Sequence, residues 1–111
     1  MKHTKNSICS IGENLGWKVE WGAQSNGKYV TFSQYSPAGE DFSFDIWYEK
    51  IGDVPDRIME YYNDFDIDEH VEMWIDARRN GVSGVPSTCR LVKDAEDIEE
   101  MIWNLAEELR A

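Results

Sequence analysis

The pattern of apolar and polar residues changes once along the chain, near residue 50. Before this point the two kinds alternate, which is typical of strands with one buried face. In the first such segment Trp17, Val19 and Trp21 alternate with Lys18 and Glu20. The alternation predicts three strands, over about residues 16–22, 28–36 and 41–49.

Two short polar segments separate these strands. Asn26-Gly27 is a strong hairpin signal between alternating segments, because both residue types tolerate positive φ. Pro37 and Gly39 interrupt the second connection, since proline lacks an amide hydrogen and glycine frees the backbone. We therefore expect an antiparallel meander, in which each strand pairs with the next one along the chain.

Beyond residue 52 the apolar residues recur at helical spacing. The spacing predicts three helices, over about residues 53–65, 67–80 and 88–109. Asp53 can cap the first helix. Asp66, with Glu69 three residues later, forms a capping-box-like pair at the start of the second. Asn80-Gly81 is a typical end for that helix.

Residues 5–15 are ambiguous. Ile8, Ile11 and Leu15 fit a short helix there, but Gly12 and Gly16 weaken the pattern. Strands followed by helices are typical of an α+β fold in which the helices pack on one face of the sheet. At 111 residues we expect a single domain, 1–111.

Acidic residues outnumber basic ones, and most of them lie in the second part of the chain. The sequence has 22 Asp and Glu against 11 Lys and Arg, and residues 53–111 hold sixteen of these acids and six of the bases. Such a surface repels phosphate, so we expect no direct binding to nucleic acid or to anionic membranes. The polar start shows no secretory signal, which favours a cytoplasmic protein.

Three acids, at positions 64, 66 and 68, have the spacing of a calcium-binding loop. Glu69 stands where that loop needs glycine, and Ile75 stands where it needs a bidentate glutamate. The two cysteines, Cys9 and Cys89, lack a CxxC partner and match no standard zinc pattern with His3 and His70. We therefore expect reduced thiols, no metal and no cofactor.

Signatures of catalysis are missing from the chain. There is no nucleophile elbow, no HExxH motif and no phosphate-binding loop, so the pattern favours a non-catalytic protein without catalytic residues. Candidate ligand-binding or partner-binding residues lie beside the proline-glycine loop and on the helices, because binding residues are frequent on loops and aromatics anchor interfaces. They are Glu40, Asp41, His70, Trp74 and Trp103.

Three segments carry a resemblance: FSQYSPAGEDFSF at 32–44, FDIDEHVEMW at 65–74, and GVP at 84–86 followed by LVKDA at 91–95. They resemble a family of short acidic proteins of gut Firmicutes and their mobile elements. The resemblance covers about residues 28–109. It implies a bacterial, intracellular accessory protein, and it carries over no catalytic residue because the family has no assigned activity.

The leading hypothesis is a non-catalytic protein-interaction module, steered toward a basic partner by residues 53–111. One alternative is a DNA mimic that inhibits a nucleic-acid-binding protein. Its acidic row would be Asp94, Glu96, Asp97, Glu99, Glu100, Glu107 and Glu108. Another alternative is a small ligand-binding domain or enzyme, with a pocket among the loops around Glu40, His70 and Gly84. A homodimer through Trp103, Met73 or the aromatic residues of the sheet fits each hypothesis.

Overall fold

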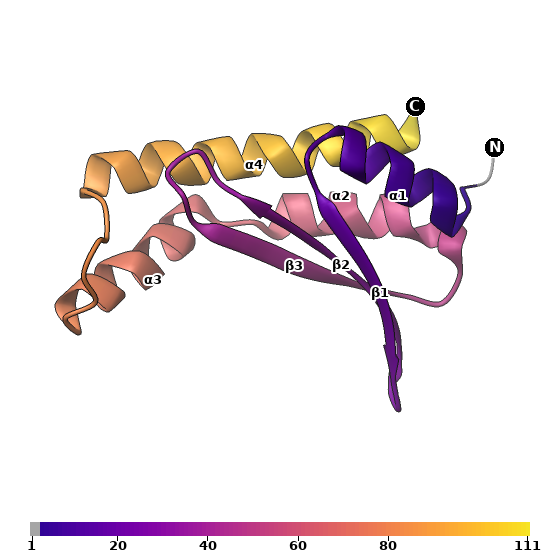
Figure 1. Cartoon of the computed structure of the whole chain (residues 1–111), viewed down its shortest axis with the longest axis horizontal. Helices are drawn as coiled ribbons and strands as arrows, with labels where there is room; N and C mark the ends of the chain where they lie inside the picture. Colours follow the sequence, from indigo (N-terminus) through magenta and orange to yellow (C-terminus); the bar gives the residue numbers. More distant parts are fainter. Residues whose placement is uncertain (1–2) are drawn as a thin grey trace.

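A computed structural model describes residues 3–111 and shows a three-stranded antiparallel sheet accompanied by helices (Figure 1). The elements are α1 (Lys5–Asn14), β1 (Lys18–Gln24), β2 (Gly27–Tyr35), β3 (Asp41–Tyr48), a 3₁₀ turn (Ile51–Asp53), α2 (Val54–Asp64), α3 (Ile67–Arg79) and α4 (Thr88–Arg110). The predicted α+β class, meander and three later helices are confirmed, and the ambiguous segment near the start is a helix. None of the helices in the described part combines the length and apolar character needed to cross a membrane.

The middle strand of the sheet pairs with both neighbours. Phe32 of β2 lies opposite Val19 of β1 and Phe44 of β3. Buried and exposed residues alternate along β3, where Phe44 is buried and Trp47 is exposed. Helices α1, α2 and α4 lie on the buried side of the sheet (Figure 1). The other side of the sheet has no helix against it in the part of the chain that the structure describes.

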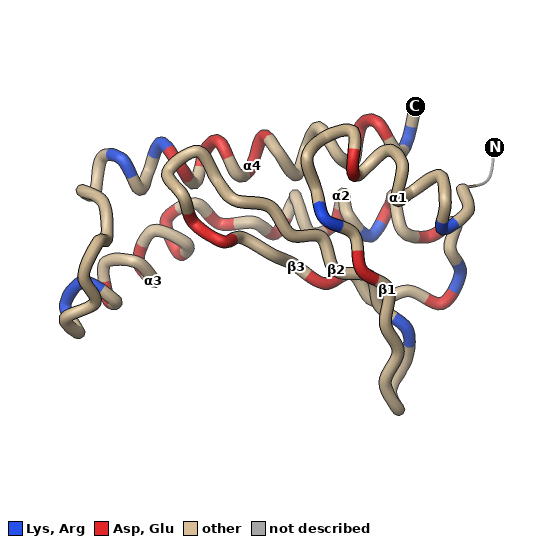
Figure 2. Tube along the Cα trace, viewed as in Figure 1, with Lys and Arg blue, Asp and Glu red and all other residues tan. Residues whose placement is uncertain are grey.

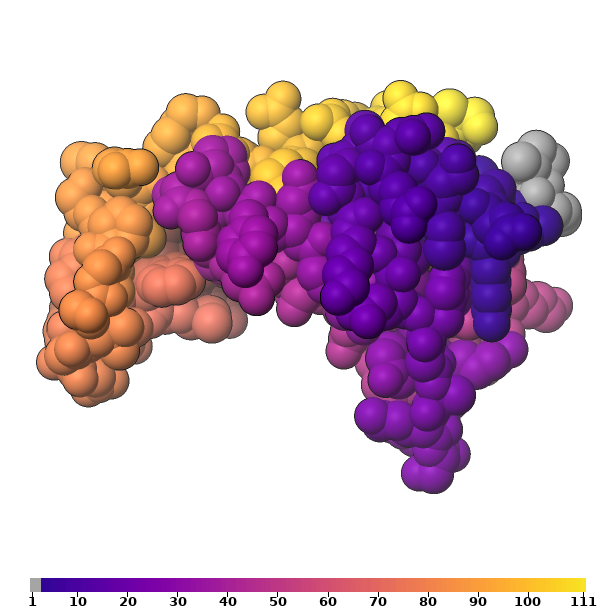
Figure 3. Space-filling model, in the orientation of Figure 1, coloured from indigo at the N-terminus to yellow at the C-terminus, as the bar shows by residue number. Residues whose placement is uncertain are grey.

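The β1–β2 hairpin forms, but its turn is not the one expected. Gln24 pairs with Gly27, so the two loop residues are Ser25 and Asn26. Gly27 has a positive φ of 142°, whereas Asn26 does not have a positive φ. Packing fixes this register, because a one-residue shift would turn the buried side chains of each strand toward solvent. The hairpin tip projects beyond the helical layer (Figure 3).

Helix α1 forms although Gly12 lies within it. The packing of α1 against β1 requires a glycine at that position. A Cβ at Gly12 would lie 2.8 Å from Cγ2 of Val19, so a larger residue would push α1 away from β1. Gly16 ends the helix with a positive φ of 91°. The amides of Gly16 and Trp17 donate to the carbonyls of Glu13 and Gly12 at 3.0 and 2.9 Å, which is a Schellman end.

The expected caps of α2 and α3 are only partly formed. Asp53 does not cap α2, because it belongs to the preceding 3₁₀ turn and its side chain makes no capping hydrogen bond. Asp66 does cap α3, where its Oδ1 accepts from the Glu69 amide at 3.1 Å. No return bond from the Glu69 side chain accompanies it among residues 3–111, so the capping box is half complete. Gly81, with a φ of 84°, ends α3 as expected.

Two apolar clusters hold the layers together. The main one joins the sheet to α1, α2 and α4, and the Trp17 ring lies edge-on to three phenylalanine rings at 5.6–6.4 Å between centroids. The smaller one lies between α3 and α4 and is built on Val71, Leu91 and Ala95. Trp74 packs against this second cluster, so α3 is fixed to α4 by an apolar contact of its own.

Replacing Phe32 by alanine should lower the free energy of unfolding by about 3–5 kcal/mol, because the side chain is fully buried and its loss leaves a cavity. Tyr35→Ala is the matched control on the same strand, since Tyr35 is 70% exposed, and it should change the value by less than about 0.5 kcal/mol. Urea denaturation followed by tryptophan fluorescence measures both. Equal losses would contradict the assignment of the buried face.

Candidate functional site

The loop between β2 and β3 is a compact turn closed by its own hydrogen bonds. The Ser36 amide donates to the Glu40 carbonyl at 2.8 Å, and the Gly39 amide donates to the Ser36 carbonyl at 2.9 Å. The Ser36 hydroxyl oxygen accepts from the Glu40 amide at 2.9 Å. Gly39 has a φ of 92°, which a larger residue would adopt only with strain. The loop therefore presents the Glu40 side chain in a fixed direction.

A buried carboxylate on α4 holds this loop from the helical side. Asp94 is 4% exposed, and its Oδ2 accepts from the Ser36 hydroxyl at 2.6 Å while its Oδ1 accepts from the Ala38 amide at 2.8 Å. No lysine or arginine of residues 3–111 forms an ion pair with Asp94. The expectation that Asp94 belongs to an exposed acidic row is wrong. Its charge is inside the molecule, where two donors satisfy it.

Three of the candidate residues meet on the other side of the loop. Glu40 Oε1 accepts from the Trp74 indole Nε1–H at 2.8 Å and lies 3.0 Å from His70 Nε2. Because an ionised carboxylate only accepts, His70 carries a proton on Nε2 when it makes this bond. The side chains of Glu40 and His70 are 14% and 13% exposed. His70 and Trp74 lie one helical turn apart, so both reach Glu40 from the same side of α3.

The other two candidate residues lie elsewhere. Asp41 is exposed at the start of β3, opposite Tyr35 of β2. Trp103 is 38% exposed on α4, and its ring packs on the ring of Tyr62 at 5.1 Å between centroids. Neither lines a hollow with the three residues that converge.

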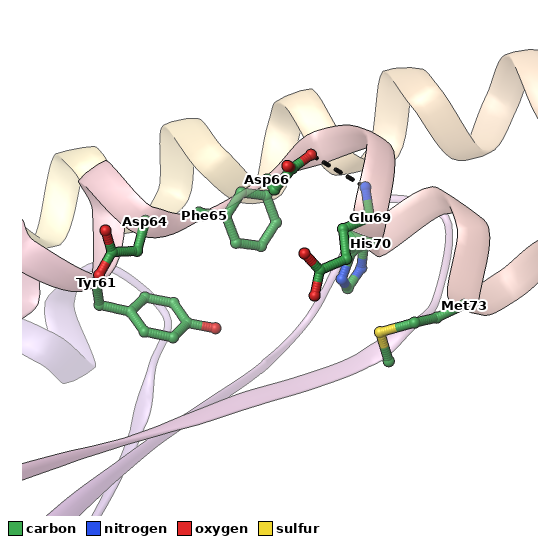
Figure 4. Close-up of a pocket in the computed structure, with 7 residues that line it drawn as sticks. All are labelled: Tyr61, Asp64, Phe65, Asp66, Glu69, His70 and Met73. Atoms are coloured by element: carbon green, nitrogen blue, oxygen red, sulfur yellow. Dashed lines mark hydrogen bonds between the residues drawn. The ribbon is translucent and has the colours of Figure 1, made fainter.

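A hollow of about 200 Å³ opens beside His70, where α2 gives way to α3 (Figure 4). Tyr61, Phe65 and Met73 supply its apolar surface. Carboxylates at positions 64, 66 and 69 supply its charge. Figure 4 shows the rings of Tyr61 and Phe65 and the carboxylate of Glu69 pointing into the same space. Burial raises the pKa of the Tyr61 phenol, and the negative charge of Glu40 raises it further.

A wider groove of about 510 Å³ lies on the other side of the same helix junction. It shares residues 64–66 with the first hollow and adds Asp68. Glu96 and Glu99 of α4 also line it, together with Val92 of the same helix, which is 37% exposed. No lysine or arginine lines either hollow. The helix junction is therefore an acidic surface with apolar side chains within it.

The polar groups around the β2–β3 loop hold that loop in place, and their geometry does not suit nucleophilic attack. A serine nucleophile must be within reach of a substrate, but Ser36 is 5% exposed and its hydroxyl is held between Asp94 and the Glu40 amide. His70 bonds Glu40 and not Ser36. Within residues 3–111 no three His, Cys, Asp or Glu side chains are placed to hold a metal ion.

Comparisons with protein-family models, with curated protein sequences and with solved structures give no match to this chain. The resemblance to short acidic proteins of Firmicutes therefore stays a prediction. The function of the protein is inferred instead from the geometry of the helix junction and of the Glu40 contacts.

Two residues of this network, Ser36 and Asp94, were absent from the candidates chosen from the sequence. A signal for Asp94 was present, because it lies three residues after Leu91 and four before Ile98, both on the apolar stripe of α4. A charged residue on a buried stripe needs a partner. The sequence did not identify Ser36 as that partner, since 58 residues separate the two.

Asp94→Asn should lower the free energy of unfolding by about 1–3 kcal/mol, because the amide keeps one acceptor and turns a donor toward the Ser36 hydroxyl or the Ala38 amide. The control is Glu96→Gln on the same helix, where the side chain is exposed and the change should stay within about 0.5 kcal/mol. Thermal and urea denaturation measure both. An unchanged free energy of unfolding in Asp94→Asn would contradict the role of this carboxylate.

Proposed function

We propose that this protein is a non-catalytic interaction module of the bacterial cytoplasm, which binds a basic segment of a partner protein at the junction of α2 and α3. The observation that carries the proposal is the pair of acidic hollows that share residues 64–66. Six carboxylates surround them, and none of the six takes part in an ion pair within the described chain. They are Asp64, Asp66, Asp68, Glu69, Glu96 and Glu99.

The distribution of basic residues leaves this surface negative. Four of the six bases of residues 53–111 lie at one end of the helical layer, around the connection between α3 and α4 and the start of α4 (Figure 2). These four are Arg78, Arg79, Arg90 and Lys93. The hydrogen bond and the charge of Asp97 raise the pKa of Lys93, and the nearby charge of Glu96 raises it further, but no lysine or arginine of residues 3–111 lines the two hollows. A surface with such an excess of carboxylates attracts a cationic partner and orients it as it approaches.

Exposed apolar side chains within the acidic surface supply the second part of the recognition. Met73 is 63% exposed beside Phe65, and Val92 is 37% exposed in the neighbouring groove. Charge mostly sets the rate and register of association, whereas buried apolar contact slows dissociation. The expected partner segment is therefore both basic and amphipathic, with lysine or arginine beside leucine-like residues.

The alternative of DNA mimicry is less well supported by this geometry. The proposed acidic row on α4 loses Asp94 to the interior, and Asp97 pairs with Lys93 at 2.5 Å. A homodimer through the helix junction would set like charges against each other. Binding of a basic partner requires no continuous acidic row on α4 and brings no like charges together.

Neutralising the groove should weaken binding to a fluorescently labelled amphipathic peptide of lysine and leucine. The triple variant Asp68→Asn, Glu96→Gln, Glu99→Gln should bind at least about tenfold more weakly at low salt, since three partly exposed ion pairs are removed. The matched control Glu13→Gln, Glu20→Gln, Glu49→Gln changes the net charge equally with exposed residues far from the groove. It should stay within about twofold of the unmodified protein. Fluorescence anisotropy at two salt concentrations measures the affinities.

Two results would contradict the proposal. Equal weakening by both triple variants would show that net charge, and not this surface, attracts the peptide. Failure of the unmodified protein to bind the peptide at low salt would remove the basis for a basic partner.

A further inference from the structure

We propose that the small hollow between the loop at 36–40 and the loop at 84–86 accepts a single lysine side chain of the basic partner. This inference rests on the proposed function, because it names one side chain through which that partner is recognised. The hollow has a volume of about 80 Å³ and lies between α3, α4 and the β2–β3 loop. It is separate from the two acidic hollows at the helix junction, which share none of its lining residues.

The walls of this hollow are suited to an unbranched apolar stem. Trp74, Pro86 and Leu91 supply aromatic and aliphatic surface. Gly39 and Gly84 also line it, and a Cβ at either position would meet nothing within 4 Å. The two glycines therefore leave space where other residues would carry side chains. The methylenes of a lysine pack on such surfaces while its ammonium reaches a polar group beyond.

The polar groups of the hollow are two carboxylates, Glu40 and Asp94. Both oxygens of Asp94 accept hydrogen bonds from the loop, and Glu40 Oε1 accepts from both His70 and Trp74. Glu40 Oε2 accepts no hydrogen bond within residues 3–111. Every fully buried side-chain oxygen of the described chain has a partner, so Oε2 is still reached by solvent. Oε2 is therefore the acceptor that an ammonium entering the hollow would meet.

The charges of the site favour a cation. Two largely buried carboxylates lie together, and the only basic side chain bonded to either of them in the described chain is His70. Each carboxylate already accepts two hydrogen bonds, so the attraction for a cation comes from the negative charge of the pair and from the Glu40 Oε2 that accepts no bond within residues 3–111. The indole of Trp74 lines the hollow as well, and an ammonium over an aromatic ring gains further attraction.

The protein's own cations do not fill this position. Arg78 donates to the Pro86 carbonyl at 2.7 Å and to the Thr88 hydroxyl at 3.4 Å. Arg90 and Lys93 line a neighbouring hollow beside Pro37, which shares Ala38 and Asp94 with this one, and neither of the two bases lines the lysine site. A compact ammonium fits the available volume better than a planar guanidinium, so the expected side chain is lysine rather than arginine.

The test compares two peptides of equal charge, one of lysine and leucine and the other of arginine and leucine, on the same protein variants. Glu40→Gln keeps an acceptor for Trp74 and His70 but removes the charge and the second carboxylate oxygen. It should weaken binding of the lysine peptide by about tenfold and binding of the arginine peptide by less than about twofold. Glu72→Gln is the matched control, since Glu72 is exposed on α3 and lines none of the hollows.

A measurement on the unmodified protein guards against a destabilised variant. The Trp74 indole N–H donates to Glu40, so its NMR signal, assigned with Trp74→Phe, should shift on addition of the lysine peptide. It should shift clearly less with the arginine peptide. An unmoved indole signal, or equal effects of Glu40→Gln and Glu72→Gln, would overturn the lysine site while leaving the proposed function standing. Absence of binding by both peptides to the unmodified protein would overturn both.

Discussion

The carboxylate of Asp94 is the contact on which the arrangement of the β2–β3 loop depends. It takes one bond from the Ser36 hydroxyl and one from the Ala38 amide, inside the protein and without a lysine or arginine ion pair among residues 3–111. A desolvated carboxylate is stable only where such donors are fixed, so the loop and α4 determine each other's position. Because Ser36 and Ala38 are fixed, the Glu40 side chain is directed toward α3, where it bonds His70 and Trp74.

Helix α3 is consequently held by two different kinds of contact. Val71 packs with Leu91 and Ala95 of α4 in the smaller apolar cluster, whereas His70 and Trp74 bond Glu40 of the loop. The apolar contact contributes most of the free energy that attaches α3 to α4, because each buried side chain contributes a few kcal/mol. The hydrogen bonds fix the rotation of the helix, since they are met in one orientation only. The hollows on both sides of α3 depend on that rotation.

The sequence predicted the elements well because their signals are local. Alternation from Phe42 to Tyr48 and helical spacing through Ile98, Ile102 and Leu105 each reflect a face that packs on the core. It left residues 5–15 ambiguous, because Gly12 lowers helix propensity while serving a close approach to Val19 that only the fold reveals. The turn at Ser25 was missed for a similar reason, since cross-strand packing overrode the Asn-Gly preference.

Predicting the site was harder, because its residues come from three separate segments. Local reasoning chose Glu40, His70 and Trp74 singly, and the fold brings them together. It placed Asp94 among the solvated acids because a run of carboxylates on a helix is usually exposed, although its stripe position pointed inward. The same distinction separates two roles for acidic residues in this protein. Carboxylates with fixed donors organise the loop, whereas those that line the hollows at the helix junction take part in no ion pair within residues 3–111.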